Sequence, residues 1–202
     1  MSKLSVLILV ISTLFLSQSL SLADSKGDKS TVPPLVQAAR KQIGVTLSYD
    51  PSYRSIPYPN GDVPVETGVC TDVVIRALRT LGLDLQKLIH EDMRKNFSKY
   101  PKIWGLKKPD KNIDHRRVPN ISCWMKRQHW SLPISKNPSD YKAGDIVTWN
   151  LSSGVPHIGI VSDKKNGQCP LIIHNIGAGT QEEDCLFEFT LTGHYRPIIK
   201  KH

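Results

Sequence analysis

The sequence predicts an α+β fold in which helices from the first part of the chain pack on an antiparallel sheet formed by the last part. Apolar residues recur at helical spacing between residues 32 and 100, whereas four short apolar runs follow residue 144. Gly, Ser, Asn and Asp separate these runs, which is typical of strands joined by turns. Helices therefore come first and strands second, unlike the alternation of a parallel α/β fold.

The first 23 residues have the pattern of a secretory signal peptide. A lysine precedes an apolar core, and Ser21 and Ala23 are the small residues expected before a cleavage site. We therefore expect cleavage after Ala23, a periplasmic or secreted protein, and a polar linker over residues 24–31. The apolar core is short for a bilayer span and no later run is long enough, so no stable membrane insertion is expected after cleavage. An uncleaved anchor is the alternative.

Three helices are predicted next, over residues 32–44, 70–82 and 83–100. The first begins at prolines, the first two end at glycines, and the third stops before a proline. Within the second, Val73–Ile75 would also suit a strand, but the length of the segment and its glycine favour a helix. The connection over residues 45–68 is rich in Pro, Tyr and Gly and long enough to suggest a binding loop.

The strands are predicted from the four apolar runs "GDIVTWN", "HIGIVSD", "PLIIHN" and "CLFEFTL", over residues 144–150, 157–163, 170–175 and 185–191. The length of the chain, 202 residues, suits one domain with a hydrophobic core, which we place at residues 32–202 and expect to be a monomer.

The chain is basic, with a formal net charge of +9. Its Lys and Arg residues are scattered, and no arginine-rich run or nucleic-acid motif accompanies them. Export also removes most nucleic-acid roles, so we expect no nucleic-acid partner. An anionic polymer of the cell envelope, such as peptidoglycan, suits the charge.

Four cysteines are present in a chain that is expected to meet an oxidising compartment, which allows three complete pairings. Cys169 and Cys185 flank an apolar run and its return strand, so they are predicted to form a disulfide across a hairpin. Cys70 and Cys123 are then bonded to each other or are free thiols. Because the sequence has no C-x-x-C or H-E-x-x-H motif, we expect no metal and no cofactor.

Cys70 is a candidate nucleophile because it lies at the predicted start of a helix. A helix N-terminus and a nearby imidazole both lower the pKa of a thiol. His157 and His174 lie on predicted strands, and if these are neighbours the imidazoles can lie side by side, one as base and the other as its orienter. A buried structural thiol and two core histidines are the alternative interpretation.

The motifs "GVCTDVVIRAL", "KAGDIVTWN", "PHIGIVSD" and "IIHNIG" resemble those of the NlpC-like cell-wall cysteine peptidases of the papain-like clan. More closely, the whole stretch over residues 32–202 resembles the bacterial domain-of-unknown-function family 1287, through "YDPSY", "YPNGDVP", "GVCTDVVIRA", "DHRRVPN" and "HNIGAG". The resemblance implies a papain-like, NlpC-like architecture.

The resemblance also implies site residues. Cys70 would be the nucleophile, His157 the general base and His174 the orienting third residue. Tyr49 could help the backbone N–H of Cys70 to stabilise an oxyanion, or be a packed loop tyrosine. The chain departs from the NlpC-like pattern by having Val-Cys-Thr-Asp where Asp-Cys-Ser-Gly is usual, and by an insertion at about residues 84–140.

The "DHRRVPN" motif within this insertion is a candidate substrate clamp. Arg116 and Arg117 can bind carboxylates in bidentate fashion, and Asp114 and His115 could position the arginines or meet an amine. Asp72, two residues after the candidate nucleophile, is also expected at the substrate. The alternative is an internal salt-bridge network that holds the insertion against the core.

The sequence thus predicts an exported cysteine hydrolase of the amidase or endopeptidase type, acting on an amide bond, with peptidoglycan stem peptides as the expected substrate. An acyl transferase, or a hydrolase of another amide or thioester, is a first alternative. A non-catalytic envelope-binding module on the same fold is a second.

Overall fold

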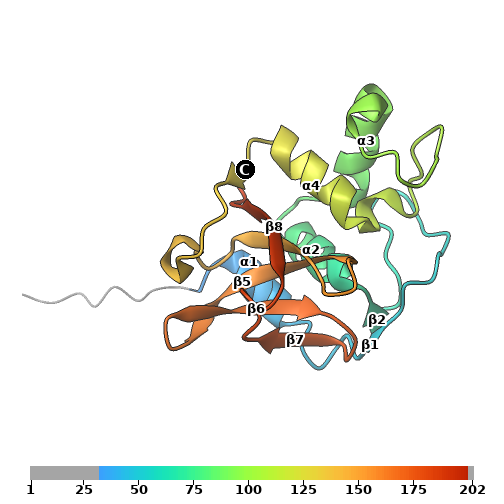
Figure 1. Ribbon diagram of the computed structural model, residues 1–202. Helices are drawn as coiled ribbons and strands as arrows, with labels where there is room; N and C mark the ends of the chain where they lie inside the picture. The colour runs from blue at the N-terminus through green and yellow to red at the C-terminus, as the bar shows by residue number, and fades with distance from the viewer. Residues whose placement is uncertain (1–31, 200–202) are drawn as a thin grey trace, which may run out of the picture. The chain divides into compact units, whose positions relative to one another are not determined.

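Helices and an antiparallel sheet are combined in the computed structural model, which describes residues 32–199 (Figure 1). The prediction of an α+β chain is therefore confirmed. The predicted signal peptide and linker, together with the last three residues, lie outside the described residues. Between residues 32 and 199, no helix is long and apolar enough to cross a membrane.

The helices begin where the sequence supplies start signals. Proline occupies the first turn of α1, and the Asp84 side chain accepts the backbone N–H of Gln86 at the start of α3. After α2, Gly82 has φ +83°, a left-handed conformation that favours glycine and ends the helix. The four helices of the described part are α1 (Pro34–Arg40), α2 (Cys70–Arg79), α3 (Leu85–Asn96) and α4 (Val118–Arg127).

The main sheet has six strands in the order β3-β8-β4-β5-β6-β7, and every neighbouring pair is antiparallel. A separate pair of two-residue strands is parallel and joins β1 (Ser48–Tyr49) to β2 (Thr67–Gly68). The strands of the main sheet are β3 (Ser131–Leu132), β4 (Ile146–Asn150), β5 (Pro156–Asn166), β6 (Cys169–Asn175), β7 (Thr180–Glu183) and β8 (Thr190–Tyr195).

The prediction of a strand over residues 185–191 is wrong for most of that range. That stretch is largely a turn, and the strands lie on either side of it as β7 and β8. Its apolar residues Cys185 and Leu186 are buried against Trp149 and Ile172 instead of pairing in the sheet. An apolar run can be buried by packing on a sheet face as well as by strand pairing, so the run alone did not distinguish the two.

The two faces of the sheet belong to different clusters of buried residues. Ile158 and Ile160 of β5 join the larger cluster, which contains α1 and α2, whereas Val161 joins the smaller cluster beneath the turn at residues 185–189. This alternation is what a strand buried on both faces produces. Residues Cys70–Leu78 of α2 are all buried, so the start of this helix is held firmly against β5.

The expected insertion, residues 84–140, contains α3 and α4, which Figure 1 shows together in the upper part of the view. Arg127 of α4 donates to Asp92 of α3 at 2.6 and 2.9 Å, and the Tyr100 hydroxyl donates to the same carboxylate at 2.6 Å. The insertion also supplies β3 to the edge of the sheet. It is therefore an integral part of the fold.

Candidate active site

Cys70 is the first residue of α2, as predicted, and only 4% of it is exposed. Nearby backbone N–H groups, first that of Ile158, favour the thiolate of Cys70. Burial outweighs them and raises the pKa of the Cys70 thiol to about 12. The sequence suggested a lowered pKa for the Cys70 thiol. The structure raises this pKa instead, because the start of α2 lies in the core. The resting thiol is therefore neutral.

His157 and His174 lie side by side on the neighbouring strands β5 and β6, as the pattern of the two runs predicts. The Nε2 atom of His157 is 2.8 Å from Nδ1 of His174, and both side chains are buried. The other ring nitrogen of His174, Nε2, is 2.8 Å from Oε2 of Glu183. The three side chains thus form one hydrogen-bonded chain that ends at a carboxylate.

The carboxylate fixes the direction of this chain. An ionised carboxylate only accepts hydrogen bonds, so His174 must donate from Nε2 and keep a lone pair on Nδ1. His157 then donates from Nε2, which leaves the lone pair of its Nδ1 free to accept a proton. Burial lowers the pKa of His157 to about 3 and also lowers that of His174, against the opposing charge of Glu183. Both rings are neutral near pH 7, and His157 is a base with its lone pair on Nδ1.

The helix that begins at Cys70, α2, contacts β5, the strand that carries His157. The backbone N–H of Ile158, the residue directly after His157, lowers the pKa of the Cys70 thiol, against the larger effect of burial. Within residues 32–199, no hydrogen bond joins the sulfur to the imidazole, so at rest the neutral thiol and the neutral base are not bonded to each other. Such bonds often tighten only when substrate is bound.

Cys70 lines a cleft of about 280 Å³. Tyr49, Trp104 and Arg117 form part of the wall, and Pro156 lies at its edge next to His157. Tyr49 pairs with Gly68 in the β1–β2 pair, which brings it close to the start of α2. Burial raises the pKa of Tyr49 to about 12, so the phenol keeps its proton. A role in oxyanion stabilisation stays a prediction.

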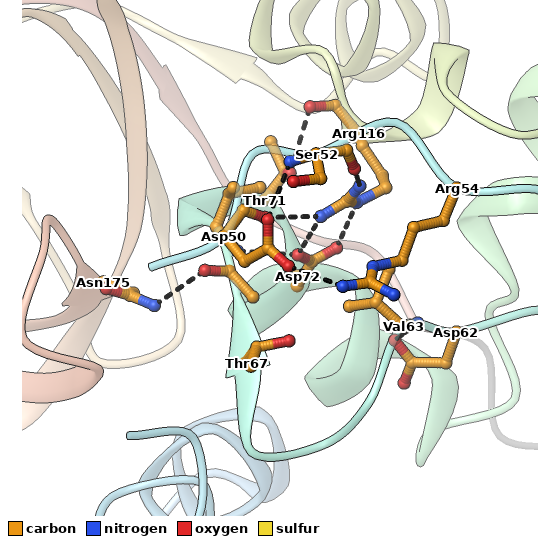
Figure 2. A network of polar contacts seen from close by, with 12 residues as sticks. Asp50, Ser52, Arg54, Asp62, Val63, Thr67, Thr71, Asp72, Arg116 and Asn175 are labelled. Carbon is orange, nitrogen blue, oxygen red and sulfur yellow. Dashed lines mark hydrogen bonds and ion pairs between the residues drawn. The ribbon is translucent and has the colours of Figure 1, made fainter. Parts of the chain in front are cut away.

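Asp72 and Arg116 form a buried internal ion pair, and Arg116 also lines the cleft, so their role in substrate binding stays a prediction (Figure 2). Arg116 donates from Nε and Nη2 to the two carboxylate oxygens at 2.9 and 2.8 Å, and both side chains are at most 4% exposed. Asp72 also accepts the backbone N–H of Val69 at 2.7 Å. Figure 2 shows Arg116 reaching toward the loop at Asp50 and Ser52, whose carbonyl oxygens it also contacts. Buried charges need partners, so this pair holds the insertion against α2.

Within the "DHRRVPN" motif, Arg116, Val118 and Pro119 line the cleft, and so does Arg117. Its guanidinium lies 4.1 Å from the ring centroid of Trp104 and 3.0 Å from the Asp114 carboxylate. Asp114 is buried and also accepts the backbone N–H of Asp110 at 2.6 Å, so its role is structural. His115 is buried away from the cleft lining, with a pKa lowered to about 3 by burial and then by Arg116. Neither Asp114 nor His115 lines the cleft, and a role for them in substrate binding stays a prediction.

The structure has all four cysteines as free thiols, so the predicted disulfide between Cys169 and Cys185 is absent from it. Cys185 is buried in the turn after β7, and its sulfur lies 3.5 Å from Nε2 of His174. Cys169 lies at the start of β6 and is only partly buried. The thiol of Cys185 thus packs on the His174 ring.

Two residues with a place at the site were not predicted. Glu183 of β7 lies diagonally across from His174 of β6, because its register partner is Ile172. The acidic run on the strand that returns beside "LIIHN" was a signal for it. Asn175 follows His174 and donates to the backbone oxygens of Gly68 at 3.1 Å and Ser48 at 3.3 Å, which anchors the pair before Cys70.

In the part of the chain that the structure describes, no three His, Cys, Asp or Glu side chains are grouped as metal ligands would be. The site therefore consists of Cys70, the histidine pair with Glu183, and the cleft lined by Tyr49 and Arg117.

Comparisons with known proteins agree with the closer of the two resemblances. The model of the family described as Domain of unknown function (DUF1287) matches residues 36–197. The Uncharacterized protein YijF of Escherichia coli (strain K12) is 54% identical over 212 residues, which cover 98% of this chain and 100% of the relative. The chain therefore belongs to the domain-of-unknown-function family DUF1287.

Proposed function

We propose that this protein is an exported cysteine hydrolase of the amidase or endopeptidase type, with a papain-like, NlpC-like arrangement of its site. The observation that carries the proposal is the hydrogen-bonded chain His157–His174–Glu183, which gives His157 a free lone pair on the strand that contacts the helix beginning at Cys70. A nucleophile, a base and an oriented support for the base are the parts that nucleophilic catalysis requires.

The proposed reaction begins with a neutral thiol. As the Cys70 sulfur attacks the carbonyl carbon of an amide, His157 takes the thiol proton on Nδ1, and the imidazolium is stabilised through His174 by Glu183. The proton then passes to the departing amine as the C–N bond breaks, which leaves a thioester on Cys70. Water attacks this thioester with His157 as base, releasing the carboxylic acid and restoring the thiol.

Charge also develops on the carbonyl oxygen during the attack. The backbone N–H of Cys70 is at the first position of α2, where helix amides lack an internal partner. Tyr49 lines the same cleft, and its raised pKa keeps the hydroxyl protonated and able to donate. These are the donors that we propose for the oxyanion.

Peptidoglycan stem peptides are the proposed substrate class. They contain many amides and carboxylates, the chain has a net charge of +9, and Arg117 lines the cysteine cleft. The signal-peptide pattern of residues 1–23 would deliver the protein to the compartment that holds this polymer.

The test is to incubate the protein lacking residues 1–23 with defined muropeptides and read the products by mass. We expect a gain of one water for each amide cleaved, lost in Cys70→Ala and His157→Ala and kept in Cys169→Ser, which changes a cysteine outside the lining of the Cys70 cleft. A product joined to an added amine would support the transferase alternative. Unchanged muropeptides that nevertheless bind would support the envelope-binding module.

A further inference from the structure

We propose that a second cavity, beside the cysteine cleft, binds a carboxylate-bearing part of the substrate. This inference rests on the proposed function, because it assigns the cavity to the substrate of Cys70. The cavity has a volume of about 540 Å³ and shares three lining residues with the cysteine cleft: Val118, Pro119 and Pro156. A ligand can therefore extend from the sulfur, across these three residues, into the second cavity.

Positive charge lies at this second cavity. Lys99 and Lys126 line it with exposed side chains, and among residues 32–199 neither ammonium group forms an ion pair. Burial, and then the charge of Asp92, raises the pKa of Cys123, which lies in the same wall. The Asp92 carboxylate is already bound by Arg127 and Tyr100. The two lysines are thus free to bind an anion from outside the chain.

The wall of the cavity also contains a polar atom that lacks a partner. Tyr195 lines the cavity and is 1% exposed, and its hydroxyl has no hydrogen-bond partner in the described part of the chain. Buried hydroxyl groups nearly always have a partner, and an unpaired one calls for an explanation such as a ligand. An oxygen of a bound carboxylate would satisfy it.

The remaining polar groups suit the same ligand. Ser122 and Thr192 line the cavity with hydroxyl groups, and Asn150 adds an amide. Val118, Pro119 and Ser122 lie in the first half of α4, whose N-terminal dipole adds to the attraction for an anion. The ridge of valine and prolines suits the apolar part of a peptide between its reacting amide and its carboxylate.

The test uses the Cys70→Ala protein, which binds without turnover, and synthetic stem peptides whose carboxylates are converted one at a time to carboxamides. We expect one such conversion to weaken binding about tenfold in isothermal titration calorimetry, and this preference to vanish in the charge-reversed pair Lys99→Glu/Lys126→Glu. The matched control is Lys136→Glu/Lys165→Glu, which makes the same charge change at exposed sites outside both cavities and should keep the preference.

Tyr195→Phe supplies a second, uncharged probe, because it removes only the hydroxyl. It should weaken binding of the preferred peptide about threefold and leave the best carboxamide peptide unaffected. Equal binding of all peptides by the Cys70→Ala protein, no binding of any of them, or an undiminished preference after charge reversal at Lys99 and Lys126 would each overturn the proposal.

Failure of the subsite and failure of the hydrolase are distinguishable. If binding prefers the carboxylate and this preference depends on Lys99 and Lys126, but the parent protein cleaves no peptide, the proposal of the subsite stands and the proposal of a hydrolase is rejected. Cleavage by the parent protein that charge reversal leaves unchanged, for every peptide, would retain the hydrolase and reject the subsite.

Discussion

Replacing Arg116 with alanine should strongly destabilise the protein, because it leaves the Asp72 carboxylate buried without its partner. Both side chains are at most 4% exposed, and the guanidinium donates to both carboxylate oxygens. Breaking a buried ion pair by removing one partner costs about 3–5 kcal/mol. For a domain of this size, such a loss lowers Tm by about 6–20 °C.

Arg54→Ala is the matched control for this change. Arg54 forms an ion pair with Asp50 at 2.9 Å in the neighbouring loop, but its side chain is 45% exposed (Figure 2). Exposed pairs contribute about 0–1 kcal/mol, so the control should barely move Tm. Differential scanning calorimetry on both variants measures the contrast. An Arg116→Ala protein as stable as the control, but with a raised KM, would refute the structural role and restore the substrate clamp.

Three further predictions concern the histidine chain and its surroundings. Glu183→Gln should lower turnover about 100-fold with little change in Tm, because the amide can donate to His174 Nε2 and reverse the chain; a kcat and KM measurement on cleaved muropeptide checks this. Asn175→Ala should lower the free energy of unfolding by about 1–3 kcal/mol in urea denaturation, since it removes both side-chain hydrogen bonds to the β1–β2 pair, and an unchanged midpoint would contradict this. The free energy of unfolding should fall as pH drops below about 6.5. His157 and His115 have pKa values lowered to about 3 in the folded protein, whereas in the unfolded chain they bind protons near pH 6.5. Urea denaturation at pH 7, 5 and 4 measures this, and no loss of stability would contradict it.

The local part of the site could be predicted from the sequence. The periodicity of the segment around Cys70 correctly indicated a helix that begins at this residue. The alternation of two apolar runs placed His157 and His174 on strands, and the structure pairs these strands as neighbours. These inferences depend on spacing within a few residues, which sequence patterns carry well.

The long-range part could not be predicted in the same way. The pairing of Asp72 with Arg116 spans 44 residues and depends on how the insertion folds back over α2. A motif with two arginines is compatible with a substrate clamp or an internal ion pair, and only burial distinguishes the two. The pKa of Cys70 is another case, because a helix start lowers it whereas burial raises it, and burial is a property of the whole fold.

The same reason explains why Glu183 was missed. Its position beside His174 depends on the register of β6 with β7, in which Ile172 is paired with Glu183. A shift of one residue would turn the carboxylate to the other face of the sheet. The sequence showed acidic residues on the return strand but not which of them would reach the ring.

The rate of Cys70 alkylation as a function of pH tests the central claim most directly. For a thiol with a raised pKa and no base, the rate rises about tenfold with each unit of increasing pH, as long as the pH is below that pKa. Neutral His157, with a pKa near 3, would instead assist the attack equally from about pH 5 to 8. Iodoacetamide labelling with site-resolved mass spectrometry, in a Cys123→Ser background, separates the two cases.

We expect a nearly level profile for Cys70 between pH 5 and 8, and a rise of about tenfold per pH unit once His157 is replaced with alanine. Profiles of equal slope in the two proteins would contradict the claim that His157 acts as the base for Cys70.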